Sequence, residues 1–244
     1  MNLDQARRIL ESLPDTARVV DVGGGGSPFP RADHVIDLAP YAERNALGKL
    51  DIACAERYTA ETWTTLDLCD RTPWPFEDGF FDFAVCSHVL EDIRDPIRVC
   101  SEMSRVAKAG YIEVPSRILE QSRGVEHPCY AGYYHHRWLI SEEDDGLVFR
   151  LKPHSLHSLR AAIVADIDIG RRINPRHALL MHEWTGTIGA REVAVFDEAG
   201  VNEEMCRFAA AARRLPDLLV PTGLSVGAKI RKAVYFQRLR WFGG

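Results

Sequence analysis

A glycine-rich turn follows a short apolar run near the start of the chain. The two read VVDVGGGGSP over residues 19–28, with Asp21 two residues before the first glycine. Glycines at the end of a strand let a ligand approach the backbone closely, because a Cβ atom would obstruct it. A carboxylate beside such a turn repels a pyrophosphate but attracts an ammonium or a sulfonium group. The turn therefore indicates a site for a cofactor that carries positive charge.

The spacing of these glycines is a poor match to a dinucleotide site. Such a site has the pattern G-x-G-x-x-G, and its third glycine allows close packing of a helix against a strand. Counting from Gly23 puts Gly25 at the second glycine position and Pro28 at the third. The pattern thus favours another nucleotide-like cofactor.

The segments around the turn alternate between strand-like and helix-like patterns. Apolar residues at helical spacing predict helices over 3–13 and 96–108. Short apolar runs predict strands over 17–22, 34–38, 80–87 and 110–114. This alternation predicts an α/β domain with a mostly parallel sheet. Three later strand-like runs, over 147–151, 178–184 and 192–196, predict an antiparallel edge on the same sheet.

Four motifs, in this order, resemble the class I S-adenosylmethionine-dependent methyltransferases, specifically their small-molecule branch and its short-linker bacterial members. The motifs are VDVGGG over 20–25, the strand-end acid Asp37, LDL over 66–68, and FEDGFFDFAVCSHVLE over 76–91. The resemblance covers roughly residues 15–160. It implies a Rossmann-like, doubly wound sheet and S-adenosylmethionine as the cofactor.

The resemblance also assigns cofactor contacts to particular residues. Asp37 would accept hydrogen bonds from both ribose hydroxyls, and Asp67 would accept one from the exocyclic amine of adenine. The fourth motif would wall the methionine end, with His88 as a wall residue and not a base. The implied cofactor-binding residues are Asp21, Gly23, Gly24, Gly25, Asp37, Leu38, Asp67, Leu68, Ser87 and His88.

One departure from the family concerns the segment between the glycine-rich turn and the second strand. Typical members have a full helix there, whereas here only SPFPRAD, residues 27–33, intervenes. Its two prolines prevent a regular helix. We therefore expect a cofactor pocket that is either more open on this side or closed by another segment.

The acceptor side is expected where histidines gather. Seven of the nine histidines lie between residues 127 and 182, and HPCYAGYYHHRW over 127–138 is rich in aromatic side chains. Methyl transfer from a sulfonium is an in-line displacement, so an alcohol acceptor must be oriented and must lose its proton. We expect His136 to be the base and Arg137 to orient the substrate, with Glu113 or Glu120 as partner or alternative base. The alternative is that His135 and His136 lie at the surface or only support the site, with Trp138 in the core.

A divalent metal is a sharper alternative on the acceptor side. Such an ion would lower the pKa of the acceptor hydroxyl. No fixed ligand spacing supports it, and adjacent histidines on a strand point to opposite faces. We therefore assign no metal ligand, although two or three side chains could bind an ion among Glu113, Glu120, His127, His135 and His136.

Composition sets the class of protein and its surroundings. The chain has 244 residues, 46% of them hydrophobic and 27% charged, with a formal charge of −5. These values exclude a disordered chain and disfavour a nucleic-acid binder, which needs a basic face. Six cysteines without a CxxC pair, and no long apolar segment, predict a cytoplasmic protein.

The predicted activity is O-methylation of a hydroxyl on a sugar, a glycan precursor or another polar small molecule. The alternative acceptor is a quinone or an aromatic metabolite, methylated on carbon or oxygen. A non-enzymatic alternative is a cofactor-binding scaffold without turnover. We expect one methyltransferase domain over 1–200, with a cofactor half at about 15–115 and an acceptor-side elaboration at about 116–190.

The remaining residues, 201–244, form a helical tail of opposite charge. They carry eight basic and three acidic side chains, and no acid follows Pro221. A helix over 228–242 would be basic and amphipathic. Such a helix could dock on an anionic membrane, on the acidic body of the protein or on a second subunit. A lipid-linked glycan as acceptor and a homo-oligomer are therefore both open.

Overall fold

The chain forms two compact units in a computed structural model that describes residues 1–144, 146–194 and 197–242. The first unit holds residues 1–114, 142–148 and 181–192, and the second holds residues 115–141, 149–180 and 193–244. The domain boundaries expected from the sequence stay a prediction, because compact units are not by themselves separate domains.

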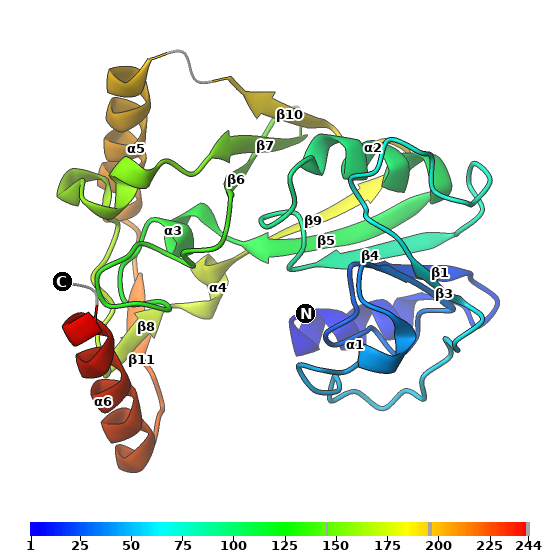
Figure 1. Ribbon diagram of the computed structural model, residues 1–244, viewed down its shortest axis with the longest axis horizontal. Helices are drawn as coiled ribbons and strands as arrows, with labels where there is room; N and C mark the ends of the chain where they lie inside the picture. The colour runs from blue at the N-terminus through cyan, green and yellow to red at the C-terminus, as the bar shows by residue number, and fades with distance from the viewer. Residues whose placement is uncertain (145, 195–196, 243–244) are drawn as a thin grey trace. The chain divides into compact units, whose positions relative to one another are not determined.

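A six-stranded sheet dominates the first unit, in the order β3-β2-β1-β4-β5-β9 (Figure 1). Its strands are β1 (Val19–Val22), β2 (His34–Asp37), β3 (Trp63–Thr65), β4 (Phe83–Ser87), β5 (Ala109–Pro115) and β9 (Leu179–Thr185). The first five pair in parallel, and β9 runs against β5 at the edge. This topology confirms the Rossmann-like, doubly wound and mostly parallel sheet with an antiparallel edge.

One face of the parallel strands is covered by helix α1 (Leu3–Ser12). Asn2 caps this helix by accepting hydrogen bonds from the backbone of the first turn. Ala6 and Ile9 of α1 belong to one core cluster with Val35 and Val85 of the sheet. The helical spacing of apolar residues near the N-terminus thus predicted the element and the face that it buries.

Helix α2 (Pro96–Val106) connects β4 to β5, as the sequence predicted. Asp95 accepts a hydrogen bond from the N–H of Arg98, and Pro96 occupies the first turn, where its missing N–H costs nothing. The other connections of the parallel strands are loops, with only a short 3-10 helix, η1 (Tyr41–Glu43). No helix separates β1 from β2, so the effect expected of the two prolines is confirmed.

A separate three-stranded sheet has the order β10-β7-β6. It consists of β6 (Trp138–Glu143), β7 (Gly146–Leu151) and β10 (Ala190–Val193). Of the three later strands predicted for the main sheet, only β9 joins it, because β7 and β10 pair instead with β6, which the sequence did not predict. The last part of the strand predicted over 192–196, Val195 and Phe196, lies outside the described residues.

The second unit contains two small apolar clusters and, besides several short elements, two longer helices. It contains α3 (Arg117–Glu120), η2 (His154–His157), η3 (Arg160–Ala162), β8 (Arg171–Ile173), α4 (Pro175–Ala178), α5 (Glu198–Ala212), β11 (Leu219–Pro221) and α6 (Val226–Phe242). Strands β8 and β11 pair antiparallel. In the part of the chain that is described, no helix has the length and apolar character needed to cross a bilayer.

Candidate active site

The glycine-rich turn begins where β1 ends. Gly23 has a φ of +75°, and its N–H donates to the carbonyl of Ile36 over 2.7 Å. Such a φ favours glycine. A Cβ on Gly24 would overlap the carboxylate of Asp21, and one on Gly25 would lie 2.6 Å from the carboxyl carbon of Asp37. The backbone is therefore bare at the carboxyl end of β1, as close approach of a ligand requires.

Asp37 lies beside this turn at the end of β2. Its Oδ2 accepts a hydrogen bond from the N–H of Gly25 over 2.8 Å, and its Oδ1 accepts one from the N–H of Ala39 over 2.7 Å. Each carboxylate oxygen keeps a further lone pair that can accept from a hydroxyl. The next residue, Leu38, is exposed. The structure thus brings together the first two motifs of the predicted cofactor site.

Asp21 is buried under the turn. Its Oδ2 accepts a hydrogen bond from the N–H of Phe29 over 2.7 Å. Burial raises the pKa of this carboxyl to about 7, against the lowering effect of the Phe29 hydrogen bond and with a smaller contribution from the charge of Asp37. Asp21 therefore stabilises the conformation of the glycine-rich turn through its hydrogen bond with Phe29.

We expect Asp21→Asn to flatten the pH dependence of stability. Because the pKa of Asp21 is higher in the folded state than its ordinary value of 3.8, its stabilising effect is present below about pH 4 and is lost as the pH rises through about 7. An asparagine can still accept from Phe29 and carries no charge. Thermal unfolding of the ligand-free proteins at several pH values should show that Asp21→Asn is more stable than the unchanged protein near pH 8. The exposed Asp51→Asn is the control, and equal pH profiles for both variants would refute this effect of Asp21.

Residues 45–48 form a turn that covers the glycine-rich turn. The N–H of Asn45 donates to the carbonyl of Gly25 over 3.1 Å, and that of Leu47 donates to Gly26 over 2.8 Å. The side chain of Leu47 lies over Gly26, where a Cβ would come within 2.8 Å of it, yet 86% of Leu47 is exposed. This segment therefore lies directly against the glycine-rich turn.

The third motif lies next to the second. The N–H of Leu66 donates to the carbonyl of Asp37 over 3.0 Å. Asp67 accepts from the N–H of Cys69 through Oδ1, and its Oδ2 lies 2.9 Å from an Arg94 nitrogen. Leu68 is buried. The carboxylate of Asp67 is thus held in place but remains partly open to solvent.

At the end of β4, His88 meets two carboxylates. Its Nε2 lies 3.2 Å from Glu113 Oε1, and its Nδ1 lies 3.5 Å from Glu91 Oε1. Glu113 is fully buried and also accepts from the Tyr111 hydroxyl over 2.7 Å and from Ser87 Oγ over 3.2 Å. The fourth motif therefore ends in a network of hydrogen bonds centred on Glu113.

This network favours the cationic form of His88 and the anionic form of Glu113. Burial alone would lower the pKa of His88, but its hydrogen bonds to Glu113 and Glu91 raise it to about 9. Burial alone would raise the pKa of Glu113, whereas hydrogen bonds from His88, Tyr111 and the Asn2 amide lower it to about 2. At neutral pH His88 is therefore a cationic donor. Glu113 is a weak base, better suited to the role of partner than to that of alternative base.

In the second unit, His136, Glu120 and Lys152 form a buried cluster. The Nδ1 of His136 lies 2.8 Å from Glu120 Oε1, and the Nζ of Lys152 donates to Glu120 Oε2 over 2.6 Å. Lys152 also donates to the carbonyl of Tyr133 over 2.7 Å. Gly132 packs against the same carboxylate with a φ of +59°, so a side chain there would be strained and would clash. Glu120 therefore holds the imidazole in one orientation.

The four predicted catalytic residues divide between the units. His136, Glu120 and Arg137 belong to the second unit, and Glu113 belongs to the first. Arg137 is exposed, while its carbonyl accepts from the N–H of Lys152 over 2.8 Å. Sequence reasoning missed Lys152 because no motif marks it and it lies 32 positions from Glu120. It also missed Glu91, although this residue ends the quoted fourth motif.

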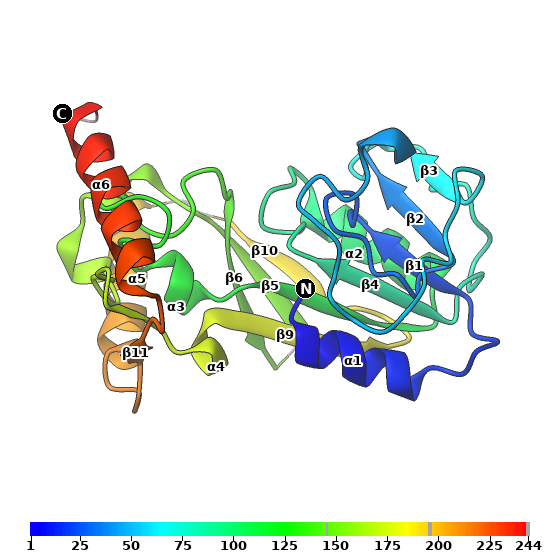
Figure 2. The same cartoon turned by 90° about the horizontal axis from the view of Figure 1, so that it is seen from below.

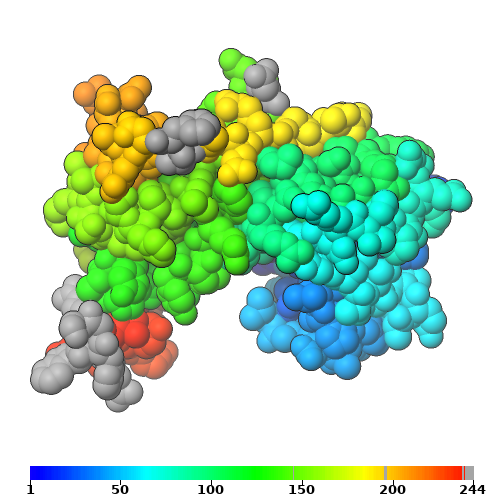
Figure 3. All heavy atoms as spheres, turned by 45° about the horizontal axis from the view of Figure 1, so that its top comes forward, coloured from blue at the N-terminus to red at the C-terminus, as the bar shows by residue number. Residues whose placement is uncertain are grey.

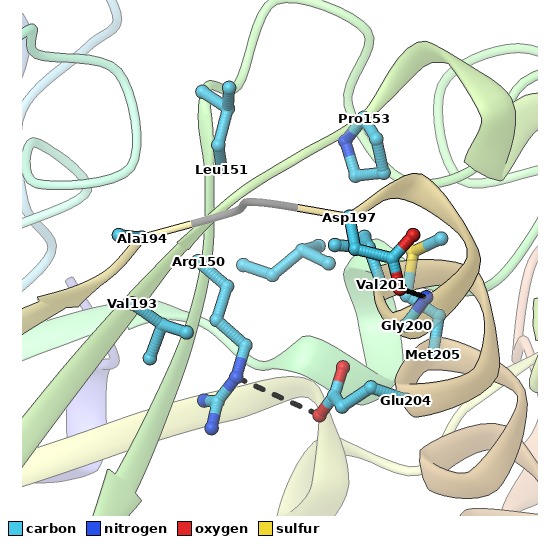
Figure 4. A pocket seen from close by; sticks show the side chains of 11 residues that line it. Arg150, Leu151, Pro153, Val193, Ala194, Asp197, Gly200, Val201, Glu204 and Met205 are labelled. Carbon is cyan, nitrogen blue, oxygen red and sulfur yellow. Dashed lines mark hydrogen bonds and ion pairs between the residues drawn. The ribbon is translucent and has the colours of Figure 1, made fainter.

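A cavity of about 340 Å³ lies in the second unit (Figure 4). Its walls are mostly aliphatic, and at one end Arg150 faces Glu204, with 3.7 Å between Nε and Oε1. The aromatic residues of 130–138 do not line it; Tyr130 stacks on His127 and Tyr133 lies against His136. The lining residues are Leu139, Arg150, Leu151, Pro153, Val193, Ala194, Asp197, Gly200, Val201, Glu204 and Met205.

Comparison with known proteins bears on the first unit. A family model described as a methyltransferase domain matches residues 34–112, from β2 into β5. No curated protein matches the chain.

Solved structures are similar only at low identity. An S-adenosylmethionine-dependent methyltransferase from Mesorhizobium loti is 20% identical, with 62% of this chain and 67% of that chain covered and a TM-score of 0.33. One from Aquifex aeolicus is 21% identical, with 46% and 64% covered and a TM-score of 0.33. One from Methanosarcina mazei is 21% identical, with 45% and 57% covered and a TM-score of 0.33. The chain spans about half to two thirds of the length of the structures that it matches.

Proposed function

The chain carries a class I S-adenosylmethionine-dependent methyltransferase domain, and we propose that it methylates a hydroxyl oxygen of a polar small molecule such as a sugar or a glycan precursor. The observation that carries the hydroxyl assignment is the imidazole of His136, held 2.8 Å from the buried carboxylate of Glu120. A fixed imidazole is the commonest group to take a proton from an alcohol.

The residues at the end of β1 and β2 fit the methyl donor. Gly24 and Gly25 allow the backbone to pack closely against Asp21 and Asp37, since a Cβ there would clash with these carboxylates, and Asp37 offers carboxylate oxygens beside the turn. Leu38, next to Asp37, and Leu47, which lies over Gly26, both present exposed apolar side chains. S-adenosylmethionine, when bound, supplies an electrophilic methyl group on a sulfonium centre. We infer that Asp37 holds the ribose and that the two leucines contact the adenosyl group.

His88 suits the methionine end of this site. As a cation whose two ring nitrogens face Glu113 and Glu91, it cannot take up a proton at neutral pH. We therefore assign it to binding and not to proton removal. Asp67 stays a proposed contact of the adenine amine, with Arg94 holding its carboxylate.

We infer that Glu120 orients the imidazole of His136 and does little to stabilise the imidazolium that forms when it takes a proton. In a triad of the serine-protease type, the buried carboxylate also stabilises the imidazolium that forms. Here the ammonium of Lys152, 2.6 Å from Glu120, offsets the carboxylate charge. Glu120 therefore chiefly fixes the tautomer and the orientation of His136. The exposed guanidinium of Arg137 is the proposed group that orients the acceptor.

A second acceptor class has one observation in its favour. The cavity in Figure 4 has mostly aliphatic walls and one charged end, an arrangement that suits an apolar body with a polar edge. A quinone or another aromatic metabolite fits this description. Tyr130 and Tyr133 pack on His127 and His136 and do not line this cavity, which favours the polar acceptor.

An acceptor screen tests the proposed function. The full chain would be incubated with S-adenosylmethionine labelled in its methyl group and with separate pools of sugars, nucleotide sugars, phenols and quinols. We expect label in a sugar pool, with a methoxyl signal in the nuclear magnetic resonance spectrum of the product. Transfer only to the aromatic pools would overturn the acceptor assignment, and a lack of transfer despite cofactor binding would indicate a scaffold.

Chelation distinguishes the proposed base from a metal. If His136 removes the proton, EDTA is expected to leave the turnover rate within about twofold of the untreated rate. The ammonium of Lys152 at Glu120 already disfavours a second cation on that carboxylate. A rate that falls with EDTA and returns with added magnesium or manganese would assign hydroxyl activation to a metal instead.

The remaining expectations on partners belong to the same proposal. The acidic total charge and the small-molecule site favour a small acceptor over a nucleic acid. A cytoplasmic location is part of the proposal, and so is an acceptor linked to a lipid. The last of these depends on what the C-terminal helix contacts.

A further inference from the structure

Helix α6 presents an apolar face to solvent. Val226, Ile230 and Val234 are spaced four residues apart and therefore share one side of the helix. They are 75%, 58% and 44% exposed, and the neighbouring Tyr235 is 52% exposed. The space-filling view shows α6, in red, at the surface of the second unit (Figure 3). A row of exposed large apolar residues on one helix marks an interaction surface.

Other residues of α6 face its own unit. Ala233 and Phe236 line a cavity together with residues of the segments 123–128 and 166–169. The ammonium of Lys232 lies 5.1 Å from the centre of the Phe236 ring. Helix α6 ends the described chain (Figure 2), and its Phe236 faces this cavity while Val226, Ile230 and Val234 remain exposed.

The sequence of the C-terminal segment carries charge of one sign. Residues 218–244 contain no acid and five basic residues, which are Lys229, Arg231, Lys232, Arg238 and Arg240. The partner must therefore offer both negative charge and an apolar phase. An anionic bilayer surface offers both, since apolar side chains enter the boundary between headgroups and acyl chains while lysine and arginine meet lipid phosphates.

We propose that the exposed face of α6, defined by Val226, Ile230 and Val234, docks on an anionic membrane surface. The helix lies on the surface and does not span the bilayer. A second copy of the chain is the weaker candidate, because a two-fold interface through this face would set basic residues against the same basic residues. The inference is independent of the methyl acceptor and of the cofactor site.

Vesicle sedimentation tests the docking directly. The full chain would be mixed with vesicles of phosphatidylcholine alone and with vesicles that also contain about 30% phosphatidylglycerol. We expect at least about tenfold stronger binding to the anionic vesicles. This binding should fall steeply as the salt concentration rises from about 0.05 M to about 0.5 M. Equal binding to both kinds of vesicle, or none to either, would overturn the proposal.

Variants on α6 locate the surface. Ile230→Ser combined with Val234→Ser should reduce binding to anionic vesicles by about tenfold, whereas the exposed Leu215→Ser, outside α6, should leave it unchanged. Lys229→Gln combined with Arg231→Gln should also reduce binding to anionic vesicles by about tenfold. Arg207→Gln combined with Arg214→Gln, on and after α5, should leave this binding unchanged. Unchanged binding in both α6 variants would contradict the assignment.

Two further measurements separate this inference from others. Affinity for S-adenosylhomocysteine should be the same in all these variants, so a failure of the proposed function would appear there and not in sedimentation. Light scattering should show the same mass with and without the serine substitutions. A concentration-dependent dimer that those substitutions abolish would assign the face to a second copy and overturn membrane docking.

Discussion

Asp37→Ala is expected to weaken the binding of S-adenosylhomocysteine by about 100-fold, as two hydrogen bonds to a charged group are lost, at about 1.5 kcal/mol or more for each. The same carboxylate fixes Gly25 and Ala39 by hydrogen bonds of 2.8 and 2.7 Å, so its removal also loosens the glycine-rich turn. Isothermal titration calorimetry measures the change.

Two control variants separate these contributions. Asp37→Asn keeps an acceptor for Gly25 and should lose less affinity than the alanine variant. Asp67→Ala should lose less still, because the Asp67 carboxylate is partly exposed and already paired with Arg94. If Asp37→Ala binds as tightly as the unchanged protein, Asp37 does not hold the ribose.

His136→Ala is expected to lower the turnover rate by about 10²-fold to 10⁴-fold without weakening cofactor binding. The base is removed, whereas Asp37 and the glycine-rich turn belong to the other unit and remain intact. Single-turnover kinetics with the acceptor found in the screen measures the rate, and calorimetry with S-adenosylhomocysteine measures the affinity.

The neighbouring His135→Ala is the matched control, since this ring is exposed and lies 3.5 Å from Glu126. It should retain most of the turnover rate. Glu120→Gln should fall between the two, because the amide can still contact His136 but leaves Lys152 without its ion-pair partner. An unchanged rate in His136→Ala would remove this residue as the base.

The sequence predicted those parts of the fold that depend on local pattern. The strands β1, β2, β4 and β5 are runs of apolar residues because both of their faces are buried. Their order along the chain fixes a parallel sheet, whose carboxyl ends meet at one edge. For this reason Asp37 and the glycine-rich turn could be expected to lie together.

Other parts depend on partners far away in the sequence. Strand β3 is only three residues long, and β6 was hidden among polar and aromatic residues. The pairing of β7 with β6 and β10, and not with the main sheet, follows from packing that no local period records.

Long-range contacts also decided the roles of site residues. Glu113 looked like a base from its place at a strand end, but His88, Tyr111 and the Asn2 amide stabilise its charged form. Lys152 follows the strand β7, and only the folded chain places its ammonium at Glu120. Two charges that pair across 32 positions of the sequence, as Lys152 and Glu120 do, leave no local motif.

The central claim is that this chain binds S-adenosylmethionine at the ends of β1 and β2 and transfers its methyl group. Titration of the full chain with S-adenosylhomocysteine, the demethylated product, tests the first half of that claim without knowledge of the acceptor. We expect saturable binding of one molecule per chain, lost in Asp37→Ala. A folded protein that shows neither heat of binding nor a shift in its unfolding temperature with this ligand would contradict it.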